Sequence, residues 1–451
     1  MQFMSEQMAS KLLEYINLIP SDRCFLKTGE KLVTYKQLDK LTSDFVGKYS
    51  YLKGKNCALI AYDRFSLALY LPAVDYLAGS VFLQANDLDD SVVNSFYKKA
   101  EIEFIITISK HNQIDIKTIN SPKSGYAANG WLLATSGTTG TPKLVSYSLD
   151  KLISTAQKNI KRGADYNWGL CYDLNRFAGL QVYLQVVVAG STLTISENDH
   201  SVHDMVNIFS LNKVNAISAT PSFWQKVLMS ENSLQLQLNK ITLGGEISSQ
   251  SILDALAYQY KGATITHIYA STEAGVGFAV KDKQAGFPVN YLDKDNSLDI
   301  SLKIIEKELW VKSTRSNNQL LAGDVEIDDQ GYVNTGDLVE CIKDRVVFLG
   351  RSSGAINIGG NKVMPEKIEA VLNKIESVNY SRVFGKSNSM LGAIVCAEIV
   401  LTTAGKSLDA KEVKKTIIKQ CKNELDTHEV PVLLKFVDSI AINSTGKLIR
   451  F

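Results

Sequence analysis

The sequence is poor in the residues that build disulfide frameworks and zinc sites. It has six cysteines and five histidines in 451 residues, with no Cys-x-x-Cys pair and no histidine cluster at zinc spacing. Scattered cysteines of this kind are typical of reduced, mostly buried thiols. We therefore expect a cytoplasmic protein.

An excess of charge of either sign is also absent. The 49 basic and 47 acidic residues give a formal net charge of +2, and charged residues make up 21% of the chain. These values are ordinary for a globular protein and do not require nucleic acid or an anionic membrane as partner.

No segment has the layout of an export signal or a membrane span. The N-terminus mixes charges into a helical pattern and lacks a basic region followed by an apolar one. The charge-free run 177–195 is interrupted by Gln181, Gln185 and Gly190. We expect a buried helix that ends at Gly190, followed by a strand, and no membrane insertion.

Short apolar runs alternate with amphipathic stretches along the chain. Strand-like runs occupy 57–62, 79–85, 104–109, 131–135, 216–220, 240–245 and 263–270. Such alternation predicts an α/β fold with active-site loops at the carboxyl ends of the strands. A cluster of Ser and Gly at 352–354 predicts a boundary between a large N-terminal domain, 1–351, with α/β sheets and a small mobile α+β C-terminal domain, 352–451.

The strongest local signal is the loop TSGTTGTPK at 135–143, which follows a predicted strand. Glycines let backbone N–H groups turn inward, hydroxyls add donors, and Lys143 adds a mobile positive charge, which together suit a polyphosphate. The loop does not align with a Walker A motif, because Pro142 precedes the lysine and Gly137 and Gly140 are only three residues apart. An ordinary polar turn is the alternative interpretation.

This loop resembles the phosphate-binding loop of the adenylate-forming superfamily, which includes acyl-CoA synthetases, adenylation domains of nonribosomal peptide synthetases, and firefly luciferase. Further signatures of that family follow in order: TYKQL (34–38), YASTEAG (269–275), YVNTGDL (332–338), GRSSGAINIGGNKVMPEKIE (350–369) and STGKLIR (444–450). Any one of these matches alone is weak, whereas the ordered set is specific.

The resemblance implies a nucleotide site for ATP and Mg²⁺. Tyr269 corresponds to the residue that stacks on adenine, Thr272 to a hydroxyl near the α-phosphate, and Glu273 to a magnesium ligand. Asp337 and Arg351 correspond to the ribose contacts. The residues that match the phosphate cradle are Thr135, Ser136, Gly137, Thr138, Thr139, Gly140 and Lys143.

The C-terminal motifs imply two half-reactions in one site. Lys447 matches the lysine that stabilises charge during adenylation, and Gly359 and Gly360 match the loop of the pantetheine tunnel, although a plain hairpin turn explains the glycines equally. Ser353 stands at the hinge position, where relatives usually have Asp or Lys.

Several positions depart from the family pattern around the acid pocket. Ala270 replaces a usual glycine, which suggests a compact acid, and Arg176 stands where relatives place His or an aromatic. Arg176 is a candidate to hold a polar substituent of the acid, with a salt-bridged surface arginine as the alternative. The candidate pocket residues are Arg176, Gly179, Pro221, Gly244, Gly245, Ala270 and Gly275.

The predicted function is an ATP-dependent acid–thiol ligase. It activates a small carboxylic acid as acyl-AMP with release of pyrophosphate, and then transfers the acyl group to coenzyme A or to the phosphopantetheine of a carrier protein. The sequence ends six residues after Thr445 without a thiolation domain, so the thiol is expected from outside the chain. The alternatives are an adenylation-only loader of a carrier protein, a luciferase-type oxygenase, and a nucleotide-binding scaffold without catalysis.

Overall fold

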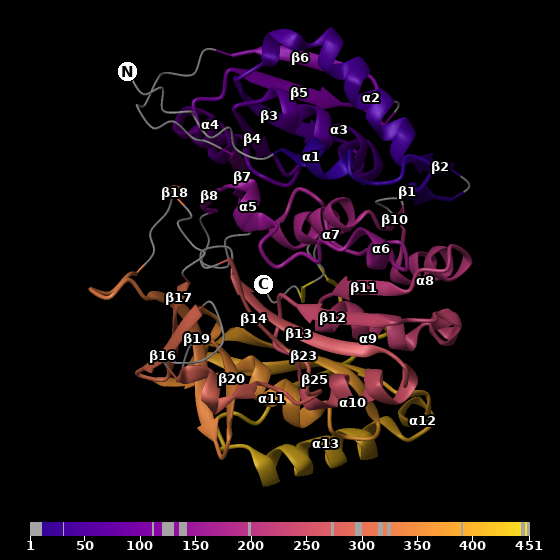
Figure 1. Ribbon diagram of the computed structural model, residues 1–451. Coiled ribbons are helices and arrows are strands. Elements are labelled where there is room, and N and C mark those ends of the chain that lie inside the picture. Colours follow the sequence, from indigo (N-terminus) through magenta and orange to yellow (C-terminus); the bar gives the residue numbers. More distant parts are fainter. Residues whose placement is uncertain are drawn as a thin grey trace.

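Strands and helices alternate through most of the chain in the computed structural model, as the expected α/β class requires. The structure describes residues 11–29, 31–110, 112–119, 130–134, 142–196, 200–271, 275–293, 300–313, 319–322, 326–388, 391–442 and 447–448. In Figure 1 the N-terminal elements lie at the top, and the C-terminal helices α12 (Thr403–Lys406) and α13 (Ala410–Glu424) lie at the foot. A large N-terminal domain with a smaller C-terminal domain is therefore confirmed.

The first sheet has seven strands among the described residues, in the order β18-β8-β7-β4-β3-β5-β6. The central strands β7, β4, β3 and β5 are parallel, and the outer pairings are antiparallel. The strands are β3 (Asn56–Ala61), β4 (Ser80–Leu83), β5 (Phe104–Ile108), β6 (Ile114–Thr118), β7 (Gly130–Ala134), β8 (Leu144–Tyr147) and β18 (Gln319–Ala322). The apolar runs predicted as strands at 57–62, 79–85 and 104–109 are confirmed as β3, β4 and β5.

Helices alternate with the strands of this first sheet along the chain. They are α2 (Tyr35–Lys48), α3 (Arg64–Leu77) and α4 (Asp90–Lys99), and a short helix α1 (Leu12–Ile16) precedes them. Helix α3 begins where the Asp63 side chain accepts the Ser66 N–H at 2.7 Å, which satisfies a donor that the helix leaves unpaired.

The second sheet has eight strands within the described ranges, in the order β14-β13-β12-β11-β9-β10-β1-β2. All pairings from β13 to β1 are parallel. The strands are β1 (Cys24–Thr28), β2 (Lys31–Thr34), β9 (Asn167–Leu170), β10 (Thr192–Ile195), β11 (Ala216–Ala219), β12 (Lys240–Gly244), β13 (Thr264–Ser271) and β14 (Gly275–Val280). The intervening helices include α7 (Phe177–Ala189), α8 (Val202–Leu211), α9 (Pro221–Met229) and α10 (Gln250–Gln259).

Helix α7 confirms the prediction for the charge-free run. It is buried along most of its length, and Gly190 follows it with φ +66°, a left-handed conformation that favours glycine at a helix end. Strand β10 begins two residues later. The apolar character of this segment therefore serves the protein core.

The third sheet is antiparallel and lies beside β13 and β14, in the order β15-β20-β19-β17-β16. Its strands are β15 (Phe287–Pro288), β16 (Ile300–Ile305), β17 (Glu308–Ser313), β19 (Val333–Ile342) and β20 (Arg345–Arg351). Strand pairing places Asp337 on β19 opposite Arg351 at the end of β20. Sequence patterns did not predict this sheet.

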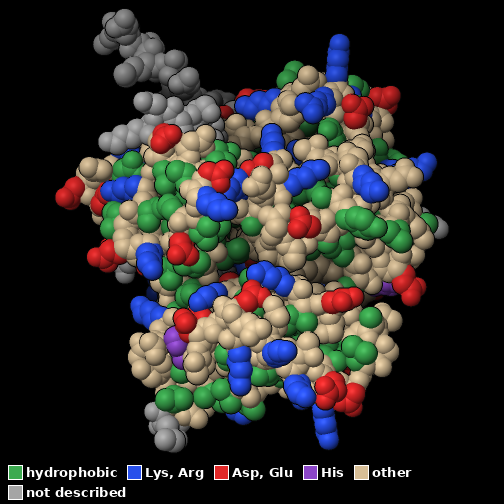
Figure 2. Space-filling view, turned by 90° about the horizontal axis from the view of Figure 1, so that it is seen from below, with side chains coloured by type: hydrophobic (Ala, Val, Ile, Leu, Met, Phe, Trp, Pro, Cys, Tyr) green, Lys and Arg blue, Asp and Glu red, His purple; other side chains and the backbone are tan. Residues whose placement is uncertain are grey.

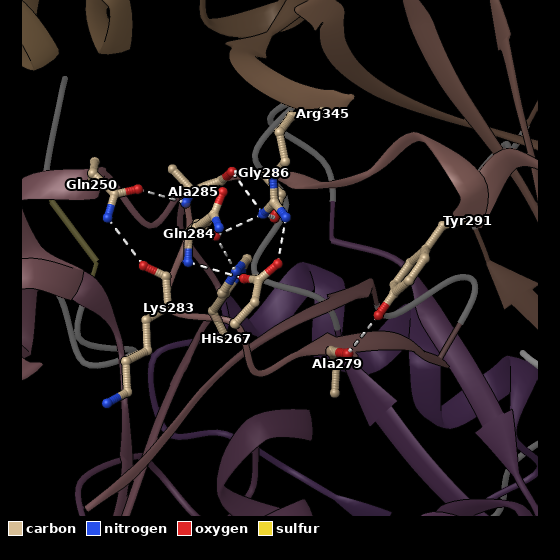
Figure 3. Close-up of polar contacts among 10 residues, drawn as sticks. Gln250, His267, Ala279, Lys283, Gln284, Ala285, Gly286, Tyr291 and Arg345 are labelled. Carbon is tan, nitrogen blue, oxygen red and sulfur yellow. Dashed lines mark hydrogen bonds and ion pairs between the residues drawn. The ribbon is translucent and has the colours of Figure 1, made fainter. Parts of the chain in front are cut away.

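A polar cluster around Arg345 joins the second and third sheets (Figure 3). The guanidinium donates to the backbone carbonyls of 284–286 and pairs with Asp282. His267 on β13 contacts the Gln284 carbonyl at 2.9 Å, and burial lowers the pKa of His267, so a neutral ring donates its N–H. Gln250 on α10 bonds to the same turn. The cluster therefore fixes the start of β20, the strand that carries Arg351.

The C-terminal elements form their own core. Strands β21 (Ile356–Ile358) and β22 (Asn361–Val363) make a hairpin, and β23 (Val378–Asn388), β24 (Gly392–Leu401) and β25 (Leu433–Phe436) make a three-stranded sheet. Helices α11 (Pro365–Leu372) and α13 contribute Ile368, Val371 and Ile417 to the buried cluster beside this sheet. The short helix η4 (Ser352–Gly354) separates these elements from β20.

Within the part of the chain that the structure describes, no helix combines the length and apolarity needed to cross a membrane. On the face seen from below in Figure 2, basic and acidic side chains are intermingled over the surface. This distribution agrees with the formal net charge of +2.

Asp75 is a buried carboxyl that makes stability depend on pH. Its side chain lies within α3, accepts the Leu12 N–H at 2.9 Å, and lies 4.0 Å from the Lys11 ammonium. Burial raises the pKa of Asp75 from 3.8 to about 6 despite Lys11. The folded protein therefore binds this proton more tightly than the unfolded chain does.

We expect this carboxyl to cost stability at neutral pH. The unfavourable contribution is fully present above pH 6 and disappears as the pH falls from about 6 to about 4, amounting to roughly 3 kcal/mol. The free energy of unfolding of Asp75→Asn minus that of the wild type, measured by urea denaturation at pH 4 to 8, should therefore rise with pH. For Asp115→Asn, which changes an exposed carboxyl, the difference in the free energy of unfolding should not vary with pH. A difference that does not vary with pH for Asp75→Asn would contradict the raised pKa of Asp75.

Candidate active site

Three predicted nucleotide-binding residues from different strands come together at one place. Asp337 accepts a hydrogen bond from the Tyr269 hydroxyl at 2.6 Å and another from the Arg351 Nε at 3.0 Å. Arg351 also donates to the Thr335 carbonyl at 2.8 Å, which fixes the plane of its guanidinium. The carboxylate is thus held between β13 and β20 by donors on both oxygens.

The electrostatic surroundings of Asp337 are mixed. Burial raises the pKa of Asp337, and the positive charges of Arg351 and Lys447 and the hydroxyl of Tyr269 act in the opposite direction. Its side chain retains 17% exposure, so a ligand can reach it. Since each carboxylate oxygen has two lone pairs, one bond from the protein leaves each oxygen able to accept a second donor.

Tyr269 stacks with two other aromatic rings. The centroids of Phe278 and Phe348 each lie 5.2 Å from that of Tyr269, with interplanar angles of 18° and 13°. Both rings are therefore nearly parallel to the ring of Tyr269, which is half-buried. Adenine stacking stays a prediction, whereas the hydroxyl bond to Asp337 is a feature of the structure.

Lys447 reaches this site from the far end of the chain. A Cβ on Gly245 would lie 3.3 Å from the Lys447 Cε and 3.7 Å from the Thr220 Cγ2, so the lysine stem lies against the turn that follows β12. Burial raises the pKa of Asp337, and the positive charge of Lys447 acts to lower it. The described residues thus bring the predicted catalytic lysine and the predicted ribose carboxylate into one site.

Glu246 takes part in this arrangement and was not among the predicted residues. One oxygen of its carboxylate accepts the Leu448 N–H at 2.9 Å, and the other accepts the Ser222 N–H at 3.0 Å. The available signal was a carboxylate directly after Gly244 and Gly245 at the end of a predicted strand. That pattern alone does not reveal a partner 202 residues away.

The other predicted pocket residues cluster at the carboxyl ends of parallel strands. Pro221 begins α9 just after β11, Gly244 ends β12, Ala270 lies near the end of β13, and Gly275 begins the antiparallel β14. Gly245 has φ +81°, a conformation that side chains rarely adopt. Ligands of open α/β sheets bind at this edge.

Arg176 is already engaged by protein groups. Its guanidinium pairs with Asp87, and Nη1 donates to the Ala134 carbonyl at 3.3 Å. Its side chain is only 9% exposed, so it is a buried ion-paired arginine and not a surface one. Contact with the acid stays a prediction. Gly179 packs against the backbone of Asp173, where a Cβ would collide with the carbonyl, so close packing requires glycine there.

The predicted phosphate loop is described only at its edges. Thr135, Ser136, Gly137, Thr138, Thr139 and Gly140 lie outside the described residues, as do Thr272 and Glu273. Ala134 at the end of β7 pairs with Leu144 at the start of β8, and Lys143 directly precedes that strand. The strands on either side of the loop are therefore adjacent in one sheet.

The residues predicted for the thiol tunnel and the hinge lie in the C-terminal elements. Gly359 and Gly360 form the turn of the β21–β22 hairpin with φ of +56° and +92°. The Gly359 N–H bonds to the Leu391 carbonyl at 2.9 Å. Ser353 is exposed in the short helix η4 between β20 and β21. A hairpin turn thus accounts for both glycines, and their tunnel role stays a prediction.

Two family models match the chain. The model described as AMP-binding enzyme matches residues 97–300, and the model described as AMP-binding enzyme C-terminal domain matches residues 367–447. The matched segments contain Tyr269 in the first case and Lys447 in the second.

Individual relatives and a solved structure extend the comparison. A 2-succinylbenzoate–CoA ligase of Bacillus cytotoxicus is 24% identical over 99% of this chain and 98% of its own length. The fatty acid–[acyl-carrier-protein] ligase MmaC of Mycobacterium marinum is 25% identical over 71% of this chain and 66% of its own. O-succinylbenzoate coenzyme A synthetase from Bacillus subtilis, in complex with ATP and magnesium, matches with a TM-score of 0.68 and 20% identity over 97% of this chain and 98% of that one.

Proposed function

Because the chain belongs to the AMP-binding enzyme family, we propose that it is an ATP-dependent ligase that joins a small carboxylic acid to a thiol. The acid carboxylate attacks the α-phosphorus of ATP, giving acyl-AMP and pyrophosphate. A thiol sulfur then attacks the acyl carbon, giving a thioester and AMP. The relatives compared are ligases of this kind, and they do not favour a luciferase-type oxygenase or an inactive scaffold.

The observation that carries the proposal is that Lys447 lies against Gly245, close enough to Asp337 for its charge to act against the burial that raises the pKa of that carboxyl. Asp337 accepts the two ribose hydroxyls through its free lone pairs, and Arg351 and Tyr269 hold its plane. Lys447, beside Gly245, places a positive charge where the attacking carboxylate and the α-phosphate meet. These groups position ATP and reduce the repulsion between the two anions.

The remaining roles follow the family pattern. By the family resemblance, the loop 135–140 with Lys143 would hold the pyrophosphate portion, and the Thr272 hydroxyl would contact the α-phosphate. Glu273 would hold Mg²⁺, and the bound ion would neutralise phosphate charge. Ser353 is the hinge of a mobile C-terminal domain, 352–451, and Gly359 and Gly360 line the thiol tunnel.

The acid and the acceptor are proposed by class. The relatives act on 2-succinylbenzoate and on fatty acids, so an acid with an apolar body is the first class to test. The acceptor is coenzyme A or the phosphopantetheine of a carrier protein. All six cysteines are free, which supports a cytoplasmic location.

The direct test is pyrophosphate release with Mg-ATP and a panel that contains 2-succinylbenzoate, fatty, aromatic, short-chain and amino acids. We expect release with a restricted set of acids, followed by thioester formation when coenzyme A or a loaded carrier protein is added. Thioester formation with the carrier protein alone identifies a loader. ATP binding without pyrophosphate release for any acid would contradict the ligase proposal.

A further inference from the structure

We propose that Glu246 is a positioning residue that fastens the Lys447 segment to the N-terminal domain for the adenylation step. Its carboxylate accepts two backbone N–H groups at once, Leu448 at 2.9 Å and Ser222 at 3.0 Å. Leu448 directly follows the lysine, and Ser222 lies in the first turn of α9. A single side chain thus bridges the two domains within one residue of Lys447.

The bond to Ser222 gives the carboxylate a fixed direction. Thr220 caps α9 by accepting the Phe223 N–H at 3.1 Å, and Glu246 satisfies the neighbouring Ser222 N–H, another donor that the helix start leaves unpaired. A carboxylate near a helix N-terminus is also favoured by the helix dipole. With one oxygen held there, the second oxygen faces the Leu448 N–H.

Glu246 is not needed merely to cap α9, because Thr220 already does so. A capping role also does not explain why its second oxygen bonds to a residue 202 positions away. That bond explains how a short C-terminal segment is held against the turn at Gly245.

The segment that carries Lys447 is attached to both domains. Ile442 and Leu448 form an antiparallel bridge, and Leu448 packs beside Tyr380, Val400 and Ile440 of the C-terminal domain. Ile442 packs against the cluster of the second sheet that includes Phe223. The Glu246 bond adds a polar contact beside these apolar ones, so it specifies where along the turn the lysine is placed.

This inference rests on the proposed function, in which Lys447 acts in adenylation and the C-terminal domain then moves for thiol transfer. In the structure the Leu448–Glu246 bond joins the domains in the arrangement that has Lys447 at Gly245. Loss of the bond should therefore slow the first half-reaction and leave the second unchanged.

Glu246→Gln tests this with a side chain of the same size. An amide offers one acceptor oxygen, so one of the two N–H groups loses its partner. We expect pyrophosphate release to slow about tenfold, the effect of one hydrogen bond to a charged group. Mg-ATP affinity and thioester formation from prepared acyl-adenylate should match the wild type.

The double variant Glu246→Gln with Lys447→Ala should release pyrophosphate no more slowly than Lys447→Ala alone. Glu231→Gln, on an exposed glutamate, is the matched control.

Hydrogen exchange of the Leu448 amide supplies a readout that needs no acid. We expect faster exchange in Glu246→Ala, which offers no acceptor to Leu448, than in the wild type and Glu231→Gln, under conditions where all three proteins are folded. Unchanged exchange, or unchanged pyrophosphate release when Lys447→Ala is slow, would overturn the inference. Failure of the wild type to release pyrophosphate with any acid would count against the proposed function, and the exchange result would still decide the role of Glu246.

Discussion

Lys447→Ala is expected to reduce the rate of acyl-adenylate formation by roughly 10²- to 10³-fold, the range found when a charge-stabilising donor is removed from a transition state. The lysine stem lies against Gly245, on the edge of the second sheet where the carboxyl ends of β11, β12 and β13 meet. Alanine leaves the attacking carboxylate and the α-phosphate without this positive charge. The measurement is pyrophosphate release under single-turnover conditions.

The matched control is Lys435→Ala, which removes an exposed lysine from β25 of the same domain. Lys435→Ala should form acyl-adenylate at the wild-type rate. Lys447→Ala should form thioester from prepared acyl-adenylate at the wild-type rate. The affinity for Mg-ATP should fall little in Lys447→Ala, because Asp337, Arg351 and the phosphate loop remain. A variant that forms acyl-adenylate at the wild-type rate would exclude Lys447 from this chemistry.

The sequence predicted the elements of the fold better than the contacts between them. Strands β3, β4, β5, β11, β12 and β13 coincide with apolar runs, because burial on both faces of a parallel sheet requires such runs. The end of α7 was predictable from Gly190, since glycine favours the left-handed conformation there. The antiparallel third sheet was missed, because its strands alternate apolar and polar residues only irregularly.

In the candidate site, too, the sequence predicted individual residues better than the contacts between them. Ordered motifs predicted Tyr269, Asp337, Arg351 and Lys447. The structure joins the first three by hydrogen bonds, and the charge of Lys447 acts against the burial that raises the pKa of Asp337. The motifs did not predict that Phe278 and Phe348 stack with Tyr269 or that Arg176 pairs with Asp87. Periodicity shows which side of a strand is buried, but it does not identify the partner on another sheet. For the same reason the role of Glu246 required the structure.

Asp337→Asn is expected to raise the dissociation constant of Mg-ATP by roughly a hundredfold, since it weakens two hydrogen bonds from the ribose hydroxyls to a charged group. The amide offers one acceptor oxygen, whereas the carboxylate accepts from Tyr269 and Arg351 and, in the proposed complex, would also accept from both ribose hydroxyls. The substitution would also leave Arg351 beside a neutral group. Titration calorimetry with Mg-ATP measures this effect without knowledge of the acid.

Two comparisons separate nucleotide binding from damage to the fold. Glu340→Gln removes an exposed carboxylate from the same strand and should bind Mg-ATP like the wild type. Tyr269→Phe removes only the hydroxyl that bonds to Asp337, and it should weaken binding less than Asp337→Asn, since Arg351 still holds the carboxylate. If Asp337→Asn binds Mg-ATP as tightly as Glu340→Gln does, the ribose cannot be held by Asp337. The Tyr269–Asp337–Arg351 network would then serve to join β13 to the third sheet.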